Sequence, residues 1–528
     1  MTPRPPHPTA GRRRTGTHRT RTHRVRTPRA LPATAVAAVL VAAALAGCSP
    51  PQRSTGGDGG TLRIAAATDV GESLNPYASN QSPTQQMRSA LLYEGLTRLS
   101  PEGRLDWGLA TEMTPNADLT EWTIRLRPGV RFSDGSDFTS ADVVASIGHL
   151  RDPAHAAQGL AFIERIDPAA VRAVDRETVR VGLSKPFGPF KEIWANVLLP
   201  MTKAGSVPDA PVGTGPFAVT AFTPGRETRL TRNDGYWGDK PKVAAVHITE
   251  YQNQQAQANA LLSDQVDIAS GATPTIAKSL ADEDGIELLD SKGDYTLRIG
   301  LNTTVAPFGD VRVRQALRLL VDREQVVSNA FGGYARVAND HEAGTPQCAA
   351  PDIPQRAPDV ERARRLLAEA GQSGLSFSIA TDGLLPGMQE MAQVFAENAA
   401  KAGVRVDLDV VTVPEFLAKW GQWPAFIDFN PTPYLPTVIG SLLPGRVGNA
   451  THWDNPDFVA LADQLFLATG QEQCAITNRM HRIENEQGAM ITPAFVNVLM
   501  PHRDRVRGLV PDVGGRPLSF LTGVTVGG

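Results

Sequence analysis

Five residues between positions 134 and 142 have side-chain oxygens that could bind a cation or a phosphate. They are Asp134, Asp137, Thr139, Ser140 and Asp142. A calcium loop needs oxygen ligands at alternating positions that end in a bidentate glutamate, and this pattern is absent. Thr139 and Asp142 instead have the spacing of a capping box, in which side chains satisfy backbone N–H groups at the start of a helix. The stretch therefore predicts a strand, a turn and a capped helix with a structural role.

The sequence contains none of the local motifs that identify common enzyme sites. A GxSxG nucleophile elbow, an HExxH zinc motif and a GxxxxGK[ST] phosphate loop are all absent. Carboxylates are plentiful, but no pair stands out as a general acid and a general base. We therefore predict that the protein is not an enzyme and needs no cofactor.

The ten histidines give no support to a metal site. His341, His452, His481 and His502 could converge on a metal, but their spacing matches no zinc motif. A solvated or core histidine is the simpler interpretation of each. No metal ligand is predicted.

The N-terminus has the features of an export signal. Nine of the first thirty residues are arginine, none is acidic, and the short, alanine-rich run Leu31–Gly47 follows. The residues before Cys48 resemble the lipobox of bacterial lipoproteins, in which that cysteine is lipidated. An uncleaved anchor is the less favoured alternative. We predict a signal peptide over 1–47, a flexible tether over 48–60 and a lipid anchor at Cys48 on the outer face of the cytoplasmic membrane.

The N-terminal residues also bear on the export route. Three consecutive arginines at 12–14 suggest twin-arginine export, but they lie far from the apolar run and the rest of that motif is missing. The general secretion route is therefore favoured.

Charge argues against nucleic acid as a partner. Residues 1–48 hold nine of the 52 basic residues and none of the 55 acidic residues, so the remaining chain has a formal charge of −12. Binding to phosphates needs a concentrated basic face, which such a chain does not suggest.

Apart from Cys48, the sequence contains two cysteines, Cys348 and Cys474. In an exported protein, such a pair is expected to form a disulfide. Two free buried thiols are the alternative. Neither cysteine has CxxC spacing, so no redox or zinc role is assigned to them.

Helix and strand patterns indicate a mixed α/β protein. Alternating apolar residues predict strands at 61–68 and 121–127 and an antiparallel pair on either side of "TPGR" at 223–226. Ser82 and Pro83 are expected at a helix start, Asp310 at the start of one long helix over 310–331, and Gly371 as the left-handed residue that ends another helix.

A strand–helix–strand unit is predicted beyond residue 370. Strands over 375–380 and 404–413 flank a helix over 387–403. Such a unit is expected to be right-handed with parallel strands, and to leave a crevice at their carboxyl ends.

Several stretches, in order, resemble the extracellular solute-binding proteins of peptide- and nickel-type ABC importers, called family 5. The similar stretches are 93–144, "GTGPFAV" at 213–219, "NDGYWGDKPKV" at 233–243, "LLSDQVDIA" at 261–269, 297–327 and 480–511. Together they extend over nearly all of residues 60–513.

The resemblance implies an α/β fold of the two-lobed periplasmic-binding-protein type (type II), with hinge strands and an extra subdomain in the first lobe. The expected first lobe comprises 61–92, 208–292 and 497–528. The expected subdomain is 93–207, and the expected second lobe is 293–496.

The resemblance also implies ligand-binding segments on both lobes. On the first lobe the expected residues are Thr68, Asn75 and Tyr77; on the second they are Trp420, Trp423, Asn430 and Tyr434. Tyr and Trp combine an apolar face with a polar group, which suits a wet cleft. Ordinary core packing is an equally weighted interpretation of Trp420.

One departure from the family pattern concerns the type of ligand. Peptide-binding members commonly have an Asp-Pro pair that holds the amino group of the peptide. This chain has "NPTPY" at 430–434, with Asp428 slightly upstream. The departure therefore argues against a salt bridge to a free amine, and with it against a peptide as the ligand.

The resulting prediction is a monomeric, lipid-anchored receptor that captures an oligopeptide or another small polar solute and delivers it to the ABC permease in the membrane. Two alternatives stay open. One is a surface sensor without a transport role, and the other is an extracytoplasmic hydrolase on the same scaffold. Nickel or haem uptake would also fit the family, but no ligand cluster supports it.

Overall fold

The computed structural model describes residues 59–527, except 69–70, 79–81, 154–156, 158, 207–210, 345–347, 349–350, 383–384 and 431–432. The predicted signal peptide, tether and lipid-anchor residue Cys48 therefore lie outside the described residues, apart from the last two tether positions. Within the described ranges, no helix is both long enough and apolar enough to span a bilayer.

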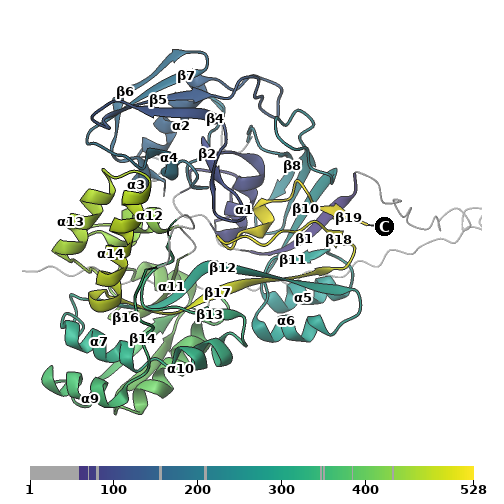
Figure 1. The fold of residues 1–528 in the computed structure, drawn as a ribbon. Helices are drawn as coiled ribbons and strands as arrows, with labels where there is room; N and C mark the ends of the chain where they lie inside the picture. The colour runs from purple at the N-terminus through teal and green to yellow at the C-terminus, as the bar shows by residue number, and fades with distance from the viewer. Residues whose placement is uncertain are drawn as a thin grey trace, which may run out of the picture. The chain divides into compact units, whose positions relative to one another are not determined.

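One large mixed sheet forms the centre of the fold (Figure 1). One half of it, the first half-sheet, contains β1 (Thr61–Ala67), β8 (Phe217–Thr223), β9 (Glu227–Arg232), β10 (Ala245–Tyr251) and β11 (Ile268–Ala269). The other half, the second half-sheet, contains β14 (Ser376–Thr381), β15 (Arg405–Val410) and β16 (Ala425–Asn430). The predicted α/β class is confirmed.

Two long antiparallel strands, β12 (Ile286–Leu301) and β17 (Met490–Arg503), join the half-sheets. At one end β17 pairs with β11, and at the other end β12 pairs with β16. The ladder between β12 and β17 is irregular between Ser291 and Tyr295. Figure 1 shows both strands running side by side between the halves.

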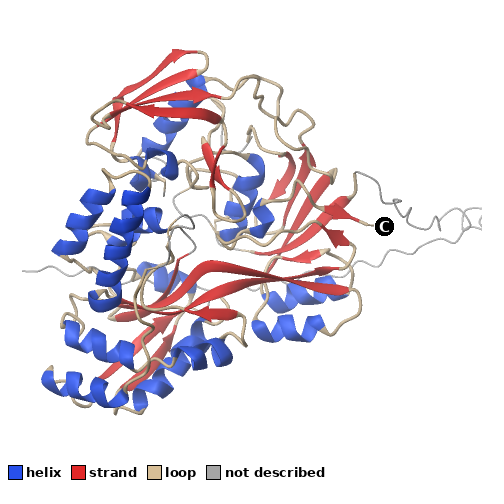
Figure 2. Cartoon of the chain, in the orientation of Figure 1, coloured by secondary structure: helices blue, strands red, loops and turns tan. Residues whose placement is uncertain are grey.

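Helices flank both half-sheets, as Figure 2 shows. Along the chain they are α1 (Pro83–Leu92), α5 (Gln254–Leu262), α6 (Pro274–Ala281), α7 (Val311–Leu319), α8 (Arg323–Gln325), η1 (Val326–Ala330), α9 (Val360–Glu369), α10 (Met388–Ala400) and α11 (Val413–Ala418). Ser82 caps α1 and Pro83 is its first residue, as predicted. Gly371 has a φ of +69°, which confirms its predicted left-handed conformation after α9. Strands β14 and β15, on either side of α10, are parallel as predicted.

The prediction of a single helix over 310–331 is wrong. Asp310 caps α7 as expected, but α7 ends at Leu319. Asp322 then accepts a hydrogen bond from the Gln325 backbone N–H at 3.0 Å and starts α8. A second capping residue inside the apolar pattern therefore divides the helix in two.

A second region, residues 96–201, has its own sheets; we call it the small-sheet region. Its strands are β2 (Thr97–Leu99), β3 (Leu105–Trp107), β4 (Ala110–Pro115), β5 (Glu121–Leu126), β6 (Ile166–Asp175) and β7 (Thr178–Leu183), and its helices are α2 (Ser140–Arg151), α3 (Leu160–Ile163) and α4 (Phe190–Ile193). In β5 the alternating Trp122, Ile124 and Leu126 are all buried, as predicted.

The oxygen-rich stretch 134–142 has the predicted structural role. The Asp142 carboxylate accepts from the backbone N–H of Thr139 at 2.8 Å and from its hydroxyl at 2.9 Å, at the start of α2. Asp134 pairs with Lys203, and Asp137 pairs with Arg176. These contacts join the turn to neighbouring loops.

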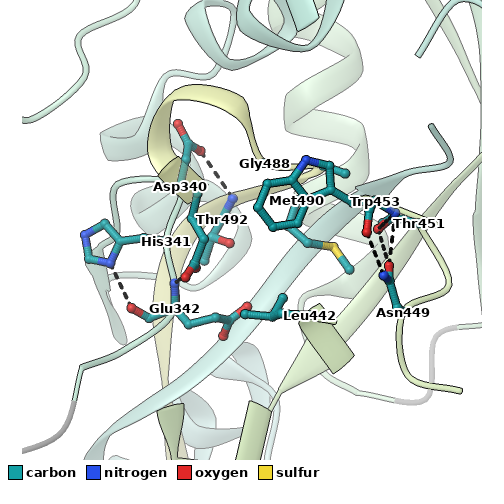
Figure 3. Close-up of a pocket in the computed structure, with 12 residues that line it drawn as sticks. Asp340, His341, Glu342, Leu442, Asn449, Thr451, Trp453, Gly488, Met490 and Thr492 are labelled. Carbon is teal, nitrogen blue, oxygen red and sulfur yellow. Dashed lines mark hydrogen bonds between the residues drawn. The ribbon is translucent and has the colours of Figure 1, made fainter. Parts of the chain in front are cut away.

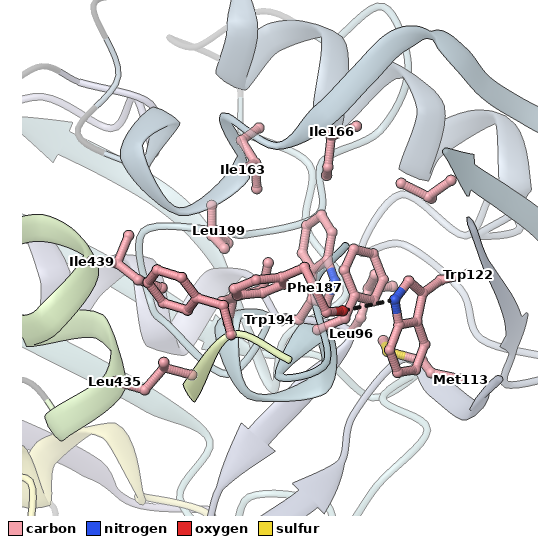
Figure 4. Close-up of a cluster of buried hydrophobic side chains, with 14 of the residues drawn as sticks. Leu96, Met113, Trp122, Ile163, Ile166, Phe187, Trp194, Leu199, Leu435 and Ile439 are labelled. Atoms are coloured by element: carbon pink, nitrogen blue, oxygen red, sulfur yellow. Dashed lines mark hydrogen bonds between the residues drawn. The ribbon is translucent and has the colours of Figure 1, made fainter. Parts of the chain in front are cut away.

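The chain between β16 and β17 forms the α12–α14 segment, residues 434–487. It contains α12 (Tyr434–Thr437), η2 (Val438–Leu442), α13 (Pro456–Leu465) and α14 (Gln471–Gln487). Most of its buried apolar side chains belong to one cluster with those of the small-sheet region. Figure 4 shows Leu435 and Ile439 of this segment beside Leu199 and Ile163.

The remaining short elements are β13 (Ala335–Val337), which pairs with β17, and β18 (Val506–Arg507), η3 (Pro517–Ser519) and β19 (Thr525–Val526) near the C-terminus. Cys348 and Cys474 form a disulfide that joins the loop after β13 to the first turn of α14. Their Cα atoms are 5.2 Å apart.

We expect the Cys348→Ser/Cys474→Ser variant to melt at a lower temperature than the wild type. The crosslink joins residues separated by 126 positions. For a loop of this length, the lower entropy of the crosslinked unfolded chain stabilises the fold by at most about 5 kcal/mol. Calorimetry with and without reductant checks this. Reductant should lower the melting temperature of the wild type and leave the variant unchanged; equal melting temperatures for all samples would contradict the prediction.

Candidate functional site

The first group of predicted site residues follows β1, a central strand of the first half-sheet. The Thr68 backbone N–H donates to the Tyr251 carbonyl at 3.0 Å, which extends the parallel β1–β10 ladder by one residue. The Thr84 hydroxyl of α1 donates to the Ala67 carbonyl at 2.7 Å. Thr68 is therefore held at the carboxyl end of β1, where α/β sheets place their ligands.

A buried ion triad lies beside this strand end. Arg88 of α1 contacts Glu250 of β10 at 2.8 Å and also pairs with Glu72, and all three side chains are almost completely buried. Burial lowers the pKa of Arg88 and raises the pKa of Glu250. The triad fixes α1, β10 and the segment after β1 relative to one another.

Asn75 and Tyr77 serve the local structure. The Asn75 side-chain oxygen accepts from the Tyr77 backbone N–H at 2.9 Å, which forms a tight turn. Tyr77 is buried, and its hydroxyl lies 3.1 Å from the Pro200 carbonyl oxygen and 2.9 Å from the Thr202 hydroxyl. Tyr77 thus packs against the chain near residue 200, and its predicted ligand role stays a prediction.

Trp420 and Trp423 lie in an aromatic cluster at the start of β16. Both indole N–H groups donate to backbone carbonyls, Trp420 to Val447 at 2.8 Å and Trp423 to Phe416 at 3.0 Å. Trp423 is buried and Trp420 is half-buried. Core packing explains Trp423, whereas Trp420 keeps part of its face accessible.

Asn430 and Tyr434 lie at the other end of β16. The six residues of that strand separate them from the tryptophans by about 20 Å along the chain. The Asn430 amide donates to Glu342 at 2.9 Å and to Thr437 at 2.8 Å. The Tyr434 hydroxyl donates to Glu484 of α14 at 2.5 Å. The structure therefore joins these two predicted residues through a polar network that the sequence did not reveal.

Arg298 of β12 is the cation of this network. It lies directly opposite Asp428 in the β12–β16 register, with a distance of 2.7 Å between the charged groups, and it also pairs with Glu342. Burial alone would lower the pKa of Arg298, but Glu342 and Asp428 together raise it above its usual value. Asp428 is thus already neutralised by a protein cation.

Glu484 is a carboxyl group of the network that is difficult to ionise. Burial and the nearby charge of Glu342 raise its pKa to about 8. It accepts hydrogen bonds from the Tyr434 hydroxyl and, at 3.0 Å, from the Glu342 backbone N–H. At neutral pH the group is therefore mostly protonated, which keeps a further buried charge out of the network.

A cavity of about 20 Å³ adjoins this network (Figure 3). The residues that line it include Glu342, Glu484, Leu442, Trp453 and Met490. A volume of this size accommodates about one water molecule.

The histidines do not form a metal site in the described part of the chain, where no three His, Cys, Asp or Glu side chains are grouped to hold a metal ion. The rings of His341 and His481 lie 4.8 Å apart. His452 and His502 instead lie within hydrogen-bond distance of the backbone carbonyls of Gly421 and Arg503.

Sequence reasoning missed Arg298, Glu342 and Glu484. Arg298 had a detectable signal, because a lone arginine within the buried apolar run 297–301 needs a buried acidic partner. Glu342 and Glu484 are 142 residues apart in the chain, so only the fold shows that they are neighbours.

We expect Arg298→Met to lower the free energy of unfolding by about 3–5 kcal/mol, because it leaves Glu342 and Asp428 buried without their cation. Arg405→Met is the matched control, since Arg405 also pairs with an aspartate of the second half-sheet but both side chains are exposed. Urea unfolding measures both variants. An equal loss of stability in the two would contradict the role of Arg298.

The raised pKa of Glu484 predicts a dependence of stability on pH. An acid with a higher pKa in the folded state stabilises the fold when protonated, so this contribution is complete below its ordinary value of 4.5 and is lost as the pH rises to about 8. For this one group, the free energy of unfolding falls by at most about 1.4 kcal/mol per pH unit. Urea unfolding between pH 5 and pH 8 should show a flatter slope for Glu484→Gln, but not for Glu486→Gln, whose side chain is exposed on the same helix. Parallel pH profiles for wild type and Glu484→Gln would count against the assignment.

Comparisons with known proteins agree with this architecture. The family model of bacterial extracellular solute-binding proteins, family 5, middle region, matches residues 105–437. The glutathione-binding protein GsiB of Escherichia coli K12 is 28% identical over 345 residues, which are 63% of this chain and 66% of GsiB, slightly less than two thirds of that relative.

Solved structures show the same two-lobed α/β fold. AgaA from A. tumefaciens R10 in complex with agropinic acid has 23% identity and a TM-score of 0.76, over 88% of this chain and 99% of AgaA. DppA from Helicobacter pylori in complex with the peptide STSA has 20% identity and a TM-score of 0.77, over 89% of this chain and 99% of DppA. The predicted fold is confirmed. The chain belongs to the bacterial extracellular solute-binding proteins of family 5.

Proposed function

We propose that this chain is the solute-binding receptor of an ABC importer, which captures a small polar solute between its lobes and delivers it to a membrane permease. The observation that carries the proposal is the placement of the segments after β1 and after β16, which we call the candidate walls of the solute site. One follows β1 in the first half-sheet and the other follows β16 in the second, and β12 and β17 connect the halves. A fold built in this way closes over a guest by bending its connecting strands.

The proposed division of the chain follows from the same arrangement. The first lobe comprises 61–92, 208–292 and 497–528, the subdomain 93–207, and the second lobe 293–496. The proposed lipid anchor at Cys48 would hold the receptor at the outer face of the membrane, beside the permease. The receptor acts as a monomer and without chemical change to the solute.

Small polar solutes are the proposed ligand class. Relatives with this fold are named for glutathione binding or were solved with agropinic acid, a peptide or Ni(L-His)2. In this chain Asp428 is paired with Arg298, so it has no free charge for the amino group of a peptide. Hydrogen bonds from the backbone and the polar side chains of the segments after β1 and after β16 would therefore supply the affinity.

Native mass spectrometry of the purified chain, followed by a thermal-shift screen of peptides, sugars, amino-acid conjugates and metal complexes, tests the proposal. A solute at 100 times its Kd should stabilise the fold by about 2.7 kcal/mol and raise the melting temperature. Turnover of a bound compound would identify a hydrolase instead. A sensor would bind a solute, but its deletion would change a response and leave uptake unaltered. If no solute of any class moves the melting curve, the receptor proposal is contradicted.

The predicted ligand role of Trp420 has its own test, because Trp420 precedes β16 and lies outside the two candidate walls: if it contacts the solute, Trp420→Ala should bind at least about tenfold more weakly than wild type. Trp107→Ala is the matched control, a half-buried tryptophan of the small-sheet region. Isothermal titration calorimetry compares the two. Equal affinities for both variants would assign Trp420 to packing alone.

A further inference from the structure

The small-sheet region and the α12–α14 segment meet along a contact surface that is separate from β12 and β17. Its apolar part contains Leu435 and Ile439 on one side and Ile163 and Leu199 on the other, all buried in one cluster (Figure 4). This burial does not involve a solute. It therefore favours contact between the two sides whether or not the cleft is occupied.

Specific contacts lie beside the apolar part. The Gly188 backbone N–H donates to the Phe466 carbonyl at 2.7 Å. The Arg165 guanidinium lies 4.5 Å from the centre of the Phe466 ring. Arg446 pairs with Glu164, and both side chains are partly exposed. These contacts form only when the two surfaces lie at a defined distance and orientation.

The two sides are fastened to different lobes. The C-terminus of α14 is held on the second lobe by Arg314, which donates to the Gly488 carbonyl at 3.0 Å and to the Gln487 carbonyl at 2.6 Å. On the opposite side, Glu94, which adjoins β2, accepts hydrogen bonds from Tyr236 at 2.9 Å and Trp237 at 2.7 Å, in the chain between β9 and β10 of the first lobe. Any opening of the cleft by bending β12 and β17 must therefore separate this contact surface.

From these contacts we propose that residues 162–199 and 435–468 form a latch, which stabilises the closed arrangement of the lobes before any solute binds. The latch rests on the proposed receptor function and adds to it a built-in balance between open and closed forms. A receptor that spends more time closed is better organised for its solute but admits it more slowly, so the strength of the latch tunes affinity and exchange.

Gly188 provides a selective way to weaken the latch. A Cβ atom at this position would lie 2.9 Å from the Ala468 carbonyl oxygen and 3.3 Å from that of Leu467, on the other side of the contact surface. Gly188→Ala therefore pushes the two surfaces apart without changing a residue of the candidate walls. The matched control is Gly148→Ala in α2 of the same region, where a Cβ would meet nothing within 4 Å.

The test measures the distance between the lobes without solute. Nitroxide labels on Val174→Cys and Val410→Cys, two positions that are 49% and 56% exposed, report it by pulsed electron paramagnetic resonance, with Cys48→Ser in every sample. Wild type should show mainly the short distance. Gly188→Ala should lower the ratio of short to long distances by about tenfold, as expected for overpacking of a close contact. Gly148→Ala should match wild type.

A distance distribution for Gly188→Ala that matches wild type would overturn the latch. If Gly188→Ala does not fold, Arg446→Glu takes its place: it should shift the distribution towards long distances, and the exchange Glu164→Arg/Arg446→Glu should restore it. Failure of either step would also overturn the proposal. Because no solute is present, failure of the latch leaves the solute screen unaffected, and a negative screen leaves the distance measurement unaffected.

Discussion

The antiparallel pairing of β12 with β17 is the constraint on which the arrangement of both lobes depends. β12 pairs with β16 of the second half-sheet and β17 pairs with β11 of the first, so the two half-sheets are continuous only through the pairing of β12 with β17. Its register shifts between Leu297 and Ile299 and, nearer the middle of the strands, is interrupted between Ser291 and Tyr295. Near this interruption the Ser291 hydroxyl donates to the Asp512 carbonyl at 3.0 Å, so the C-terminal segment supports the strands there. Bending concentrated at such an interruption would move the lobes as bodies and preserve each core.

Buried ion networks fix the candidate walls on each side of these strands. Arg88 holds Glu72 and Glu250 beside the end of β1, and Arg298 holds Glu342 and Asp428 beside the end of β16. Buried ion pairs add little net stability, since desolvation offsets most of the attraction between the charges. Their effect here is to give one defined position to Asn430, whose amide binds Glu342. A rigid wall loses less conformational entropy when a solute binds.

Much of the scaffold could be predicted from local sequence patterns. The alternation in β5, the caps of α1 and α2, the closing residue Gly371 and the parallel β14–β15 pair all follow from rules that act over a few residues. Asp322 was missed as a second cap because the apolar pattern continues through it. Local rules therefore predict where helices and strands form better than they predict where a helix is interrupted.

The site was less predictable, because its partners are far apart in the chain. Arg298 and Asp428 are 130 residues apart and meet only through the register of β12 with β16. Trp420 and Trp423 were grouped with Asn430 and Tyr434 by sequence proximity, but an extended strand separates the two pairs. The chemistry of a tyrosine suits a ligand cleft, yet the Tyr77 hydroxyl contacts residues 200 and 202.

The central claim is that a solute is held between the segment after β1 and the segment after β16. The most direct measurement is a crystal structure of the chain with a solute that it binds. We predict electron density for the solute in contact with residues of both 68–77 and 430–434. Density confined to one lobe, or located away from both segments, would contradict the claim.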